Sequence, residues 1–211
     1  MPLQNRVDPY GRLHTVAARG TMMGNRGVLH DDAKRLVAPW RTRRWICCVL
    51  EFRGRHREVF APRRYSELFF LDEATALAAG HRPCAECRRP RYEEFRAAWA
   101  RGRRPRESRV PVADDIDRVL HEERSPRDGS AKGFGARLAT LPPGVIVELQ
   151  GRPWLVLGDA LTPWSFDGYG QAVAAGSETL TRVLTPRSIV RAIRAGFVPG
   201  MHESARRLAA R

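Results

Sequence analysis

The sequence predicts an α+β fold with two units: a small α/β module over residues 1–105, and a small β-barrel or curled sheet with flanking helices over residues 110–211. Short runs of β-forming residues recur along the chain, and helix patterns with start and stop signals lie between them. Residues 101–109 form a basic stretch interrupted by proline, which is typical of a linker. A chain of 211 residues can bury one good core or two small ones.

The first unit contains strand patterns followed by two helices. Residues 43–52 are rich in β-formers and, together with a turn and residues 56–61, predict a β-hairpin. Residues 67–71 predict a short buried strand. Asp72 is a suitable N-cap for the helix that follows, and Gly80 ends this helix. Pro90 suits the first turn of a second helix, in which aromatic residues recur on one face.

The second unit begins with an amphipathic helix over residues 112–124. Residues 144–149 and 154–158 predict a hairpin, and residues 179–184 predict a further strand. Pro186 opens a last helix, which Gly196 closes.

Two groups in this second unit have a chemical and a structural interpretation. Asp114, Asp117 and His121 share one face of the helix over 112–124, which suits acid–base chemistry or a metal-dependent nuclease but is also the pattern of a solvated face. Asp159 and Asp167 are further carboxylates that could line a pocket. The aromatic residues of this unit could stack nucleic-acid bases or simply fill its core; they are Trp154, Trp164, Phe166 and Tyr169.

Positive charge is concentrated in one part of the chain. The net charge is +14, and residues 33–109 hold 20 of the 37 Lys and Arg residues against 9 of the 23 Asp and Glu residues. Nearly all the basic residues are arginine, as in proteins from GC-rich genomes, but codon bias does not explain why the charge is concentrated. Such a density attracts polyanions, of which we expect nucleic acid rather than a membrane.

The sequence also indicates a cellular compartment. No run of eighteen apolar residues predicts a transmembrane helix, and the first residues lack the apolar segment of a signal peptide. We therefore expect a cytoplasmic protein. In that compartment disulfides are rare, and paired cysteines more often bind metal.

Four cysteines are candidates for a zinc site. Cys84 and Cys87 form a C-x-x-C turn just after a helix ends, where two thiolates can converge on one cation. Neighbouring side chains in a strand point to opposite faces, so a regular strand delivers only one of Cys47 and Cys48. We favour Cys47, because its face is less apolar, although a bulge would allow both. A histidine or water would complete the site, and the candidates are His30, His56 and His81; four buried free thiols are the alternative.

The stretch Leu-Phe-Phe-Leu-Asp-Glu-Ala-Thr-Ala-Leu-Ala-Ala-Gly-His-Arg-Pro-Cys-Ala-Glu-Cys resembles the metal-binding domain of the Ada DNA-repair proteins. The resemblance is dense over residues 69–88 and extends over about 43–99. It implies a zinc site with four cysteine ligands, in which Cys84 and Cys87 are the second pair, and an affinity for DNA. The family's first two cysteines lie four residues apart, whereas Cys47 and Cys48 are adjacent, so its methyl-transfer chemistry does not carry over directly.

These observations predict an arginine-rich, zinc-containing protein that binds nucleic acid, DNA before RNA, in repair, processing or regulation. The contacts to the phosphate backbone of the nucleic acid would come from basic residues near the cysteines, namely Arg43, Arg44, Arg82, Arg88, Arg89 and Arg91. The alternative is a nuclease, glycosylase or alkyl transferase, with its active site in the second unit or at a zinc thiolate. A structural RNA-binding protein is a third possibility.

Overall fold

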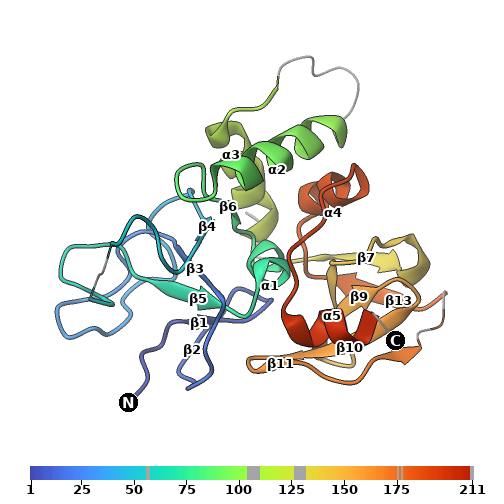
Figure 1. Cartoon of the computed structure of the whole chain (residues 1–211), viewed down its shortest axis with the longest axis horizontal. Coiled ribbons are helices and arrows are strands. Elements are labelled where there is room, and N and C mark those ends of the chain that lie inside the picture. The colour runs from blue at the N-terminus through green and yellow to red at the C-terminus, as the bar shows by residue number, and fades with distance from the viewer. Residues whose placement is uncertain (56–57, 104–109, 126–131, 175, 177, 210–211) are drawn as a thin grey trace.

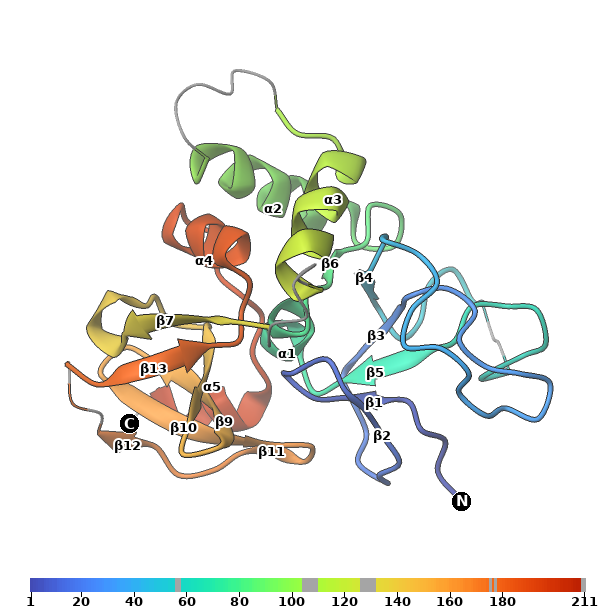
Figure 2. The same ribbon diagram turned by 180° about the vertical axis from the view of Figure 1, so that it is seen from behind.

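The computed structural model of the chain describes all residues except 56–57, 104–109, 126–131, 175, 177 and 210–211. It contains two β-sheets with helices between and beside them, which confirms the predicted α+β class. The sheets lie on opposite sides of a central helical layer (Figures 1 and 2). In the described part of the chain, no helix is long and apolar enough to cross a membrane.

The first sheet has six short strands in the order β2-β1-β5-β3-β4-β6. Strand β4 pairs antiparallel with β3 and parallel with β6, so residues distant in the sequence hold it on both sides. The predicted hairpin between residues 43–52 and 56–61 is therefore wrong for the described residues, because the local turn competes with two non-local partners. The strands are β1 (Arg6–Val7), β2 (Leu13–His14), β3 (Met22–Asn25), β4 (Ile46–Cys48), β5 (Leu68–Phe70) and β6 (Arg82–Pro83).

The second sheet follows the order β11-β10-β9-β8-β13-β7, and β12 pairs with β10. The predicted hairpin is present as β8 and β9, and the predicted strand over residues 179–184 is present as β13. The strands are β7 (Phe134–Arg137), β8 (Ile146–Leu149), β9 (Arg152–Leu157), β10 (Ala160–Ser165), β11 (Gly168–Tyr169), β12 (Val173–Ala174) and β13 (Leu180–Val183); Leu138–Thr140 form a 3₁₀ turn.

Helices α1 to α4 form where the sequence predicts helices, whereas α5 near the C-terminus was not predicted. Helix α1 begins after Asp72, whose carboxylate accepts hydrogen bonds from the N–H and hydroxyl of Thr75. It ends at Ala78, with Ala79 as its C-cap, and Gly80, which has a φ of +87°, follows the cap. Pro90 lies in the first turn of α2. The helices are α1 (Glu73–Ala78), α2 (Arg89–Arg101), α3 (Ala113–Arg124), α4 (Arg187–Arg194) and α5 (Glu203–Ala209).

The largest apolar core runs across the predicted boundary between the units. Phe95 and Trp99 from α2 and Ile116 and Leu120 from α3 are buried in one cluster with residues of the second sheet and α4. A smaller cluster lies between the first sheet and α1. Trp164 and Tyr169 are buried core residues, which favours the structural interpretation of these aromatics.

Candidate metal centre

Three of the four thiols converge at one point of the molecule. Cys48 ends strand β4, and Cys84 and Cys87 lie in the turn between β6 and α2. Their Sγ atoms all lie within 4.8 Å of one another. No other group of three or more His, Cys, Asp and Glu side chains in the described residues brings its ligand atoms together in this way.

Backbone hydrogen bonds hold the turn in place. The N–H of Cys84 donates to the carbonyl of Cys47 at 2.9 Å, which fastens the turn to strand β4. The N–H of Arg88 donates to the carbonyl of Cys84 at 3.2 Å, immediately before α2 begins. The C-x-x-C spacing thus fits the connection between a parallel strand and a helix.

Backbone N–H groups also point at the sulfur atoms. The N–H of Glu86 lies 3.4 Å from Cys84 Sγ, and the N–H of Cys87 donates to the same sulfur. The N–H of Val49 donates to Cys87. Donors of this kind stabilise negative charge on sulfur, so the backbone of the turn is arranged for thiolates.

The three thiols strongly affect each other's ionisation. Hydrogen bonds from Cys48, and then from Cys87, lower the pKa of Cys84, and contacts with Cys84 and Cys87 raise the pKa of Cys48. The group therefore holds one thiolate easily, while further ionisation meets repulsion between like charges. A divalent cation would offset this repulsion and release the remaining protons. Such a set of soft sulfur donors fits a thiophilic metal.

Cys48, and not the predicted Cys47, belongs to this group. Cys47 is 1% exposed and packs in the core of the first sheet with Val7, Leu29 and Phe70. Burial raises the pKa of its thiol, and Arg88 Nη1 donates a hydrogen bond to its Sγ at 3.5 Å. The expectation that a regular strand delivers one cysteine holds. The choice between the two fails because the face of β4 that carries Cys47 is the face turned to the core.

The structure places none of the described candidate histidines in the thiol group. His30 is bound through Nδ1 by the Ser66 hydroxyl at 2.7 Å, and its Nε2 lies 3.2 Å from the carbonyl of Ala61. His81 is fully buried, and its Nε2 accepts from Arg26 at 3.2 Å. Burial and then the charge of Arg26 lower the pKa of His81 well below its ordinary value, so it stays neutral. His56 lies outside the described residues.

Three of the six predicted nucleic-acid-binding arginines have internal partners. Arg82 is 2% exposed and forms a bidentate ion pair with Asp117, at 2.9 and 2.8 Å, so this side chain does not reach the surface. Arg88 and Arg91 both bind the buried carboxylate of Glu73, at 2.7 and 2.6 Å. No periodic signal in the sequence marks these pairs, because their partners lie 15 to 35 residues away along the chain.

The other three predicted arginines are exposed. Arg43 and Arg44 precede strand β4, and Arg89 begins α2. Arg44 lies 3.9 Å from Asp114, and Arg89 pairs with Glu93 at 3.0 Å. Exposed pairs of this kind contribute little stability and exchange easily. These side chains therefore remain accessible to an anionic partner.

The carboxylates of α3 do not form the predicted acid–base group. Asp117 is buried in its ion pair with Arg82, whereas Asp114 is exposed. His121 packs its ring edge-on against Trp40, with 4.8 Å between the ring centroids. The polar face of α3 is thus partly covered by the first unit and is not simply solvated. Asp159 lies in the exposed turn between β9 and β10.

Comparison with models of protein families, with curated proteins and with solved structures gives no significant match. The resemblance to the Ada metal-binding domain thus stays a prediction from residues 69–88.

Proposed function

We propose that this protein binds one zinc ion through Cys48, Cys84 and Cys87 and binds nucleic acid through the arginine-rich surface beside the ion. The observation that supports the proposal most strongly is the convergence of three thiols from two separate segments of the chain. Free cysteines of a reduced protein are usually packed singly as small apolar residues, as Cys47 is.

Zinc is the metal that best suits this donor set. Structural zinc sites have four ligands, and three protein ligands leave one position for water or another group. Backbone N–H donors to the sulfurs offset part of the negative charge of three thiolates. Bound zinc would join β4 to the start of α2 and so stabilise the first sheet.

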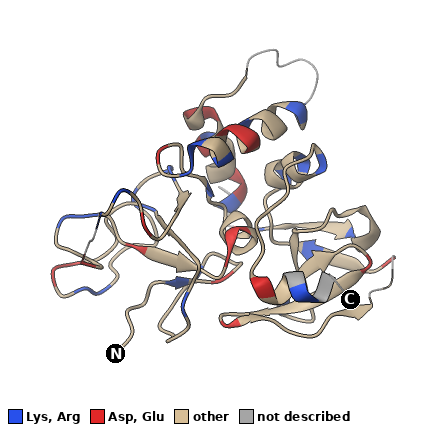
Figure 3. Ribbon diagram, in the orientation of Figure 1, with Lys and Arg blue, Asp and Glu red and all other residues tan. Residues whose placement is uncertain are grey.

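An anionic partner suits the surface around this centre. The loops of the first sheet carry many arginines (Figure 3). In the described part of the chain, Arg41, Arg43, Arg63 and Arg64 are exposed and form no ion pair. Arg55 pairs with Glu86 in the cysteine turn at 3.1 Å, so these loops adjoin the proposed metal site. The resemblance to Ada makes double-stranded DNA the first partner to test.

The zinc assignment is tested by comparing two neighbouring cysteines. We expect Cys48→Ser to lose most of its bound zinc, because it removes one of three ligands. Cys47→Ser, which keeps an acceptor for Arg88, should retain close to one zinc per chain. Metal content of the folded, purified proteins by mass spectrometry measures both. A Cys48→Ser protein with full zinc, or a wild-type protein without it, would refute the assignment.

The nucleic-acid assignment is tested by the salt dependence of binding. Affinity for a DNA duplex should fall steeply as salt rises, and the Arg43→Ala/Arg44→Ala variant should reduce the slope by about one unit for each phosphate that its side chains no longer reach. The matched control is Arg137→Ala/Arg152→Ala in the second sheet, which should leave the slope unchanged. Absence of binding at low salt, or an equal loss in the control, would contradict the proposal.

A further inference from the structure

Trp40 is an exposed tryptophan in the arginine-rich part of the chain. It is 39% exposed, and it is the only aromatic residue among the exposed large apolar residues in the described part of the chain. Leaving part of an indole ring in water gives up the stabilisation that its burial would provide. An exposed tryptophan among basic residues therefore suits a ligand that has flat, apolar faces as well as negative charge.

The residues that follow Trp40 belong to the proposed nucleic-acid interface. Arg41 and Arg43 are exposed, and neither forms an ion pair with a described residue. The phosphates of a nucleic acid bind cations of this kind, whereas its bases stack on aromatic rings. Residues 40–43 thus offer both kinds of contact within one short segment.

The segment that carries Trp40 is held in place by the backbone. The N–H groups of Arg41 and Thr42 donate to the carbonyl of Arg26 at 2.9 and 3.1 Å. Gly27, which has a φ of +100°, allows this close approach, because a Cβ on it would lie 2.9 Å from the Cβ of Arg41. A ring on a fixed segment loses little conformational freedom when it binds a ligand.

A single ring contact orients the indole of Trp40. The ring packs at 75° against the imidazole of His121 on α3, with 4.8 Å between the centroids. An edge-on contact of this kind covers at most one face of the indole, so the other face is left for a ligand. The described residues form no hydrogen bond with the indole N–H, whereas three other tryptophans donate theirs to an oxygen; these are Trp45, Trp154 and Trp164.

Two other aromatic rings of the first unit are already covered by arginine. The guanidinium groups of Arg26 and Arg124 lie 3.9 and 4.0 Å from the ring centre of Trp45, which is buried. Arg53 lies over the ring of Phe52 at 5.0 Å. No guanidinium of the described residues lies over the exposed tryptophan in this way, so its open face has no partner within the protein.

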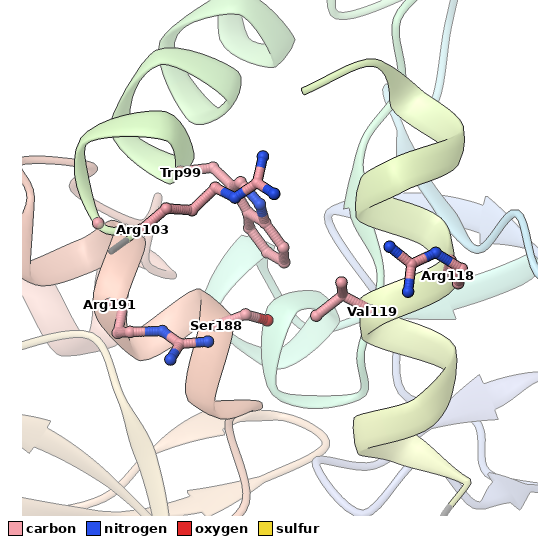
Figure 4. Close-up of a pocket in the computed structure, with 7 residues that line it drawn as sticks. Trp99, Arg103, Arg118, Val119, Ser188 and Arg191 are labelled. Atoms are coloured by element: carbon pink, nitrogen blue, oxygen red, sulfur yellow. The ribbon is translucent and has the colours of Figure 1, made fainter. Parts of the chain in front are cut away.

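A cavity of about 330 Å³ between α2, α3 and α4 also brings a tryptophan and arginines together (Figure 4). Trp99 in its wall is only 4% exposed, so this ring offers no open face to a base. The charge of its wall is partly compensated, since Arg118 pairs with Glu122 at 3.6 Å. The surface around Trp40 differs from this cavity in both respects.

We propose that Trp40 stacks on an unpaired base, and that the arginine-rich surface binds single-stranded nucleic acid more tightly than a duplex. Arg41 and Arg43 bind the phosphates next to that base. In a duplex each base is stacked on its neighbours, so a base has to leave the stack before an aromatic side chain can contact its face. The inference rests on the nucleic-acid binding proposed above and adds to it that the partner is single-stranded.

Binding of three oligonucleotides of equal length to the full-length, metal-loaded protein tests the inference. They are a single DNA strand that cannot pair with itself, the same strand with abasic sites in place of its central nucleosides, and the duplex. We expect the wild type to bind the single strand about tenfold more tightly than the abasic strand, which keeps the phosphates but lacks the bases. It should also bind the single strand more tightly than the duplex.

Variants at position 40 separate stacking from charge. Trp40→Ala should weaken binding of the single strand about tenfold and change binding of the abasic strand and the duplex by less than about twofold. Its salt dependence should equal that of the wild type, because no phosphate contact is lost. Trp40→Phe should retain most of the affinity. Leu180→Ala, which removes an exposed apolar side chain from the second sheet, is the matched control and should bind as the wild type does.

The outcomes distinguish a failure of stacking from a failure of nucleic-acid binding. Stacking is refuted if the wild type binds the single and abasic strands equally, if it prefers the duplex, or if folded Trp40→Ala binds all three ligands as the wild type does. An equal loss for all three ligands in Trp40→Ala also refutes it. In these cases salt-dependent binding of the wild type would still support the proposed function. Absence of binding to all three ligands at low salt refutes both.

Discussion

Cys47 and Cys48 differ in which face of strand β4 they occupy, and this difference decides their chemistry. Alternation along a strand predicts that only one of them joins Cys84 and Cys87. The sequence could not identify which one, because the buried face is defined by what packs on it. Val7 and Leu29, which cover Cys47, come from segments with no local relation to β4.

Arg82 is a charged residue whose burial, like that of Cys47, could not be predicted from the sequence alone. Its position beside the cysteines suggested a surface contact, yet parallel pairing of β6 with β4 turns it inward toward Asp117 on α3. Burying a guanidinium is costly unless a counter-charge compensates it, and this counter-charge lies 35 residues further along the chain. No sequence pattern marks a pair at that separation.

Removing Asp117, the partner of Arg82, should destabilise the folded protein. We expect Asp117→Ala to lower the free energy of unfolding by about 3–5 kcal/mol, because it leaves a buried guanidinium without its counter-charge. Asp114→Ala removes an exposed carboxylate from the same helix and should change stability by less than about 0.5 kcal/mol. Denaturant unfolding measures both. Equal stability of the two variants would contradict the buried-pair assignment.

At the scale of elements, predictions from local signals were correct, and the prediction that ignored non-local strand pairing was wrong. The cap at Asp72 and the stop at Gly80 set the ends of α1 as the sequence predicts, since both depend on neighbouring backbone groups. The hairpin predicted after residue 52 failed because β4 pairs instead with β3 and β6. Register between distant strands has no signature within a short window of sequence.

Glu73, in the first turn of α1, joins three parts of the chain. Its carboxylate binds Arg88, which caps α2, and Arg91, in the first turn of α2, and it accepts a hydrogen bond from the N–H of Gly200 at 2.7 Å. Burial raises the pKa of this carboxyl, but pairing with Arg91 and Arg88 outweighs burial and holds the pKa below its ordinary value. The unfolded chain therefore takes up this proton more readily than the folded protein.

The sign of this shift predicts a loss of stability in acid. The contribution of Glu73 is fully present above the ordinary carboxyl pKa and is lost as the pH falls through its lower folded value. Glu73→Gln should be less stable at neutral pH by about 2 kcal/mol and should lose less stability than the wild type between about pH 5 and pH 3. Unfolding curves across this range test it, with the exposed Glu178→Gln as control. A variant that follows the wild-type profile would contradict it.

At the scale of the whole molecule, two sheets share the helices between them. The sequence predicted the fold class and most of the helices, because amphipathic patterns report which face is buried. It placed a linker at residues 101–109, whereas the main core contains residues from both sides of that stretch. Composition marks where a chain is polar, but it does not show whether the helices on either side pack together.

The central claim is that three thiolates, Cys48, Cys84 and Cys87, bind zinc where the first sheet meets α2. X-ray absorption at the zinc edge of the purified protein tests this claim most directly. We predict a coordination sphere of three sulfur atoms at about 2.3 Å and one nitrogen or oxygen. A sphere of four sulfurs would bring Cys47 into the site and contradict the assignment, and so would a sphere without sulfur.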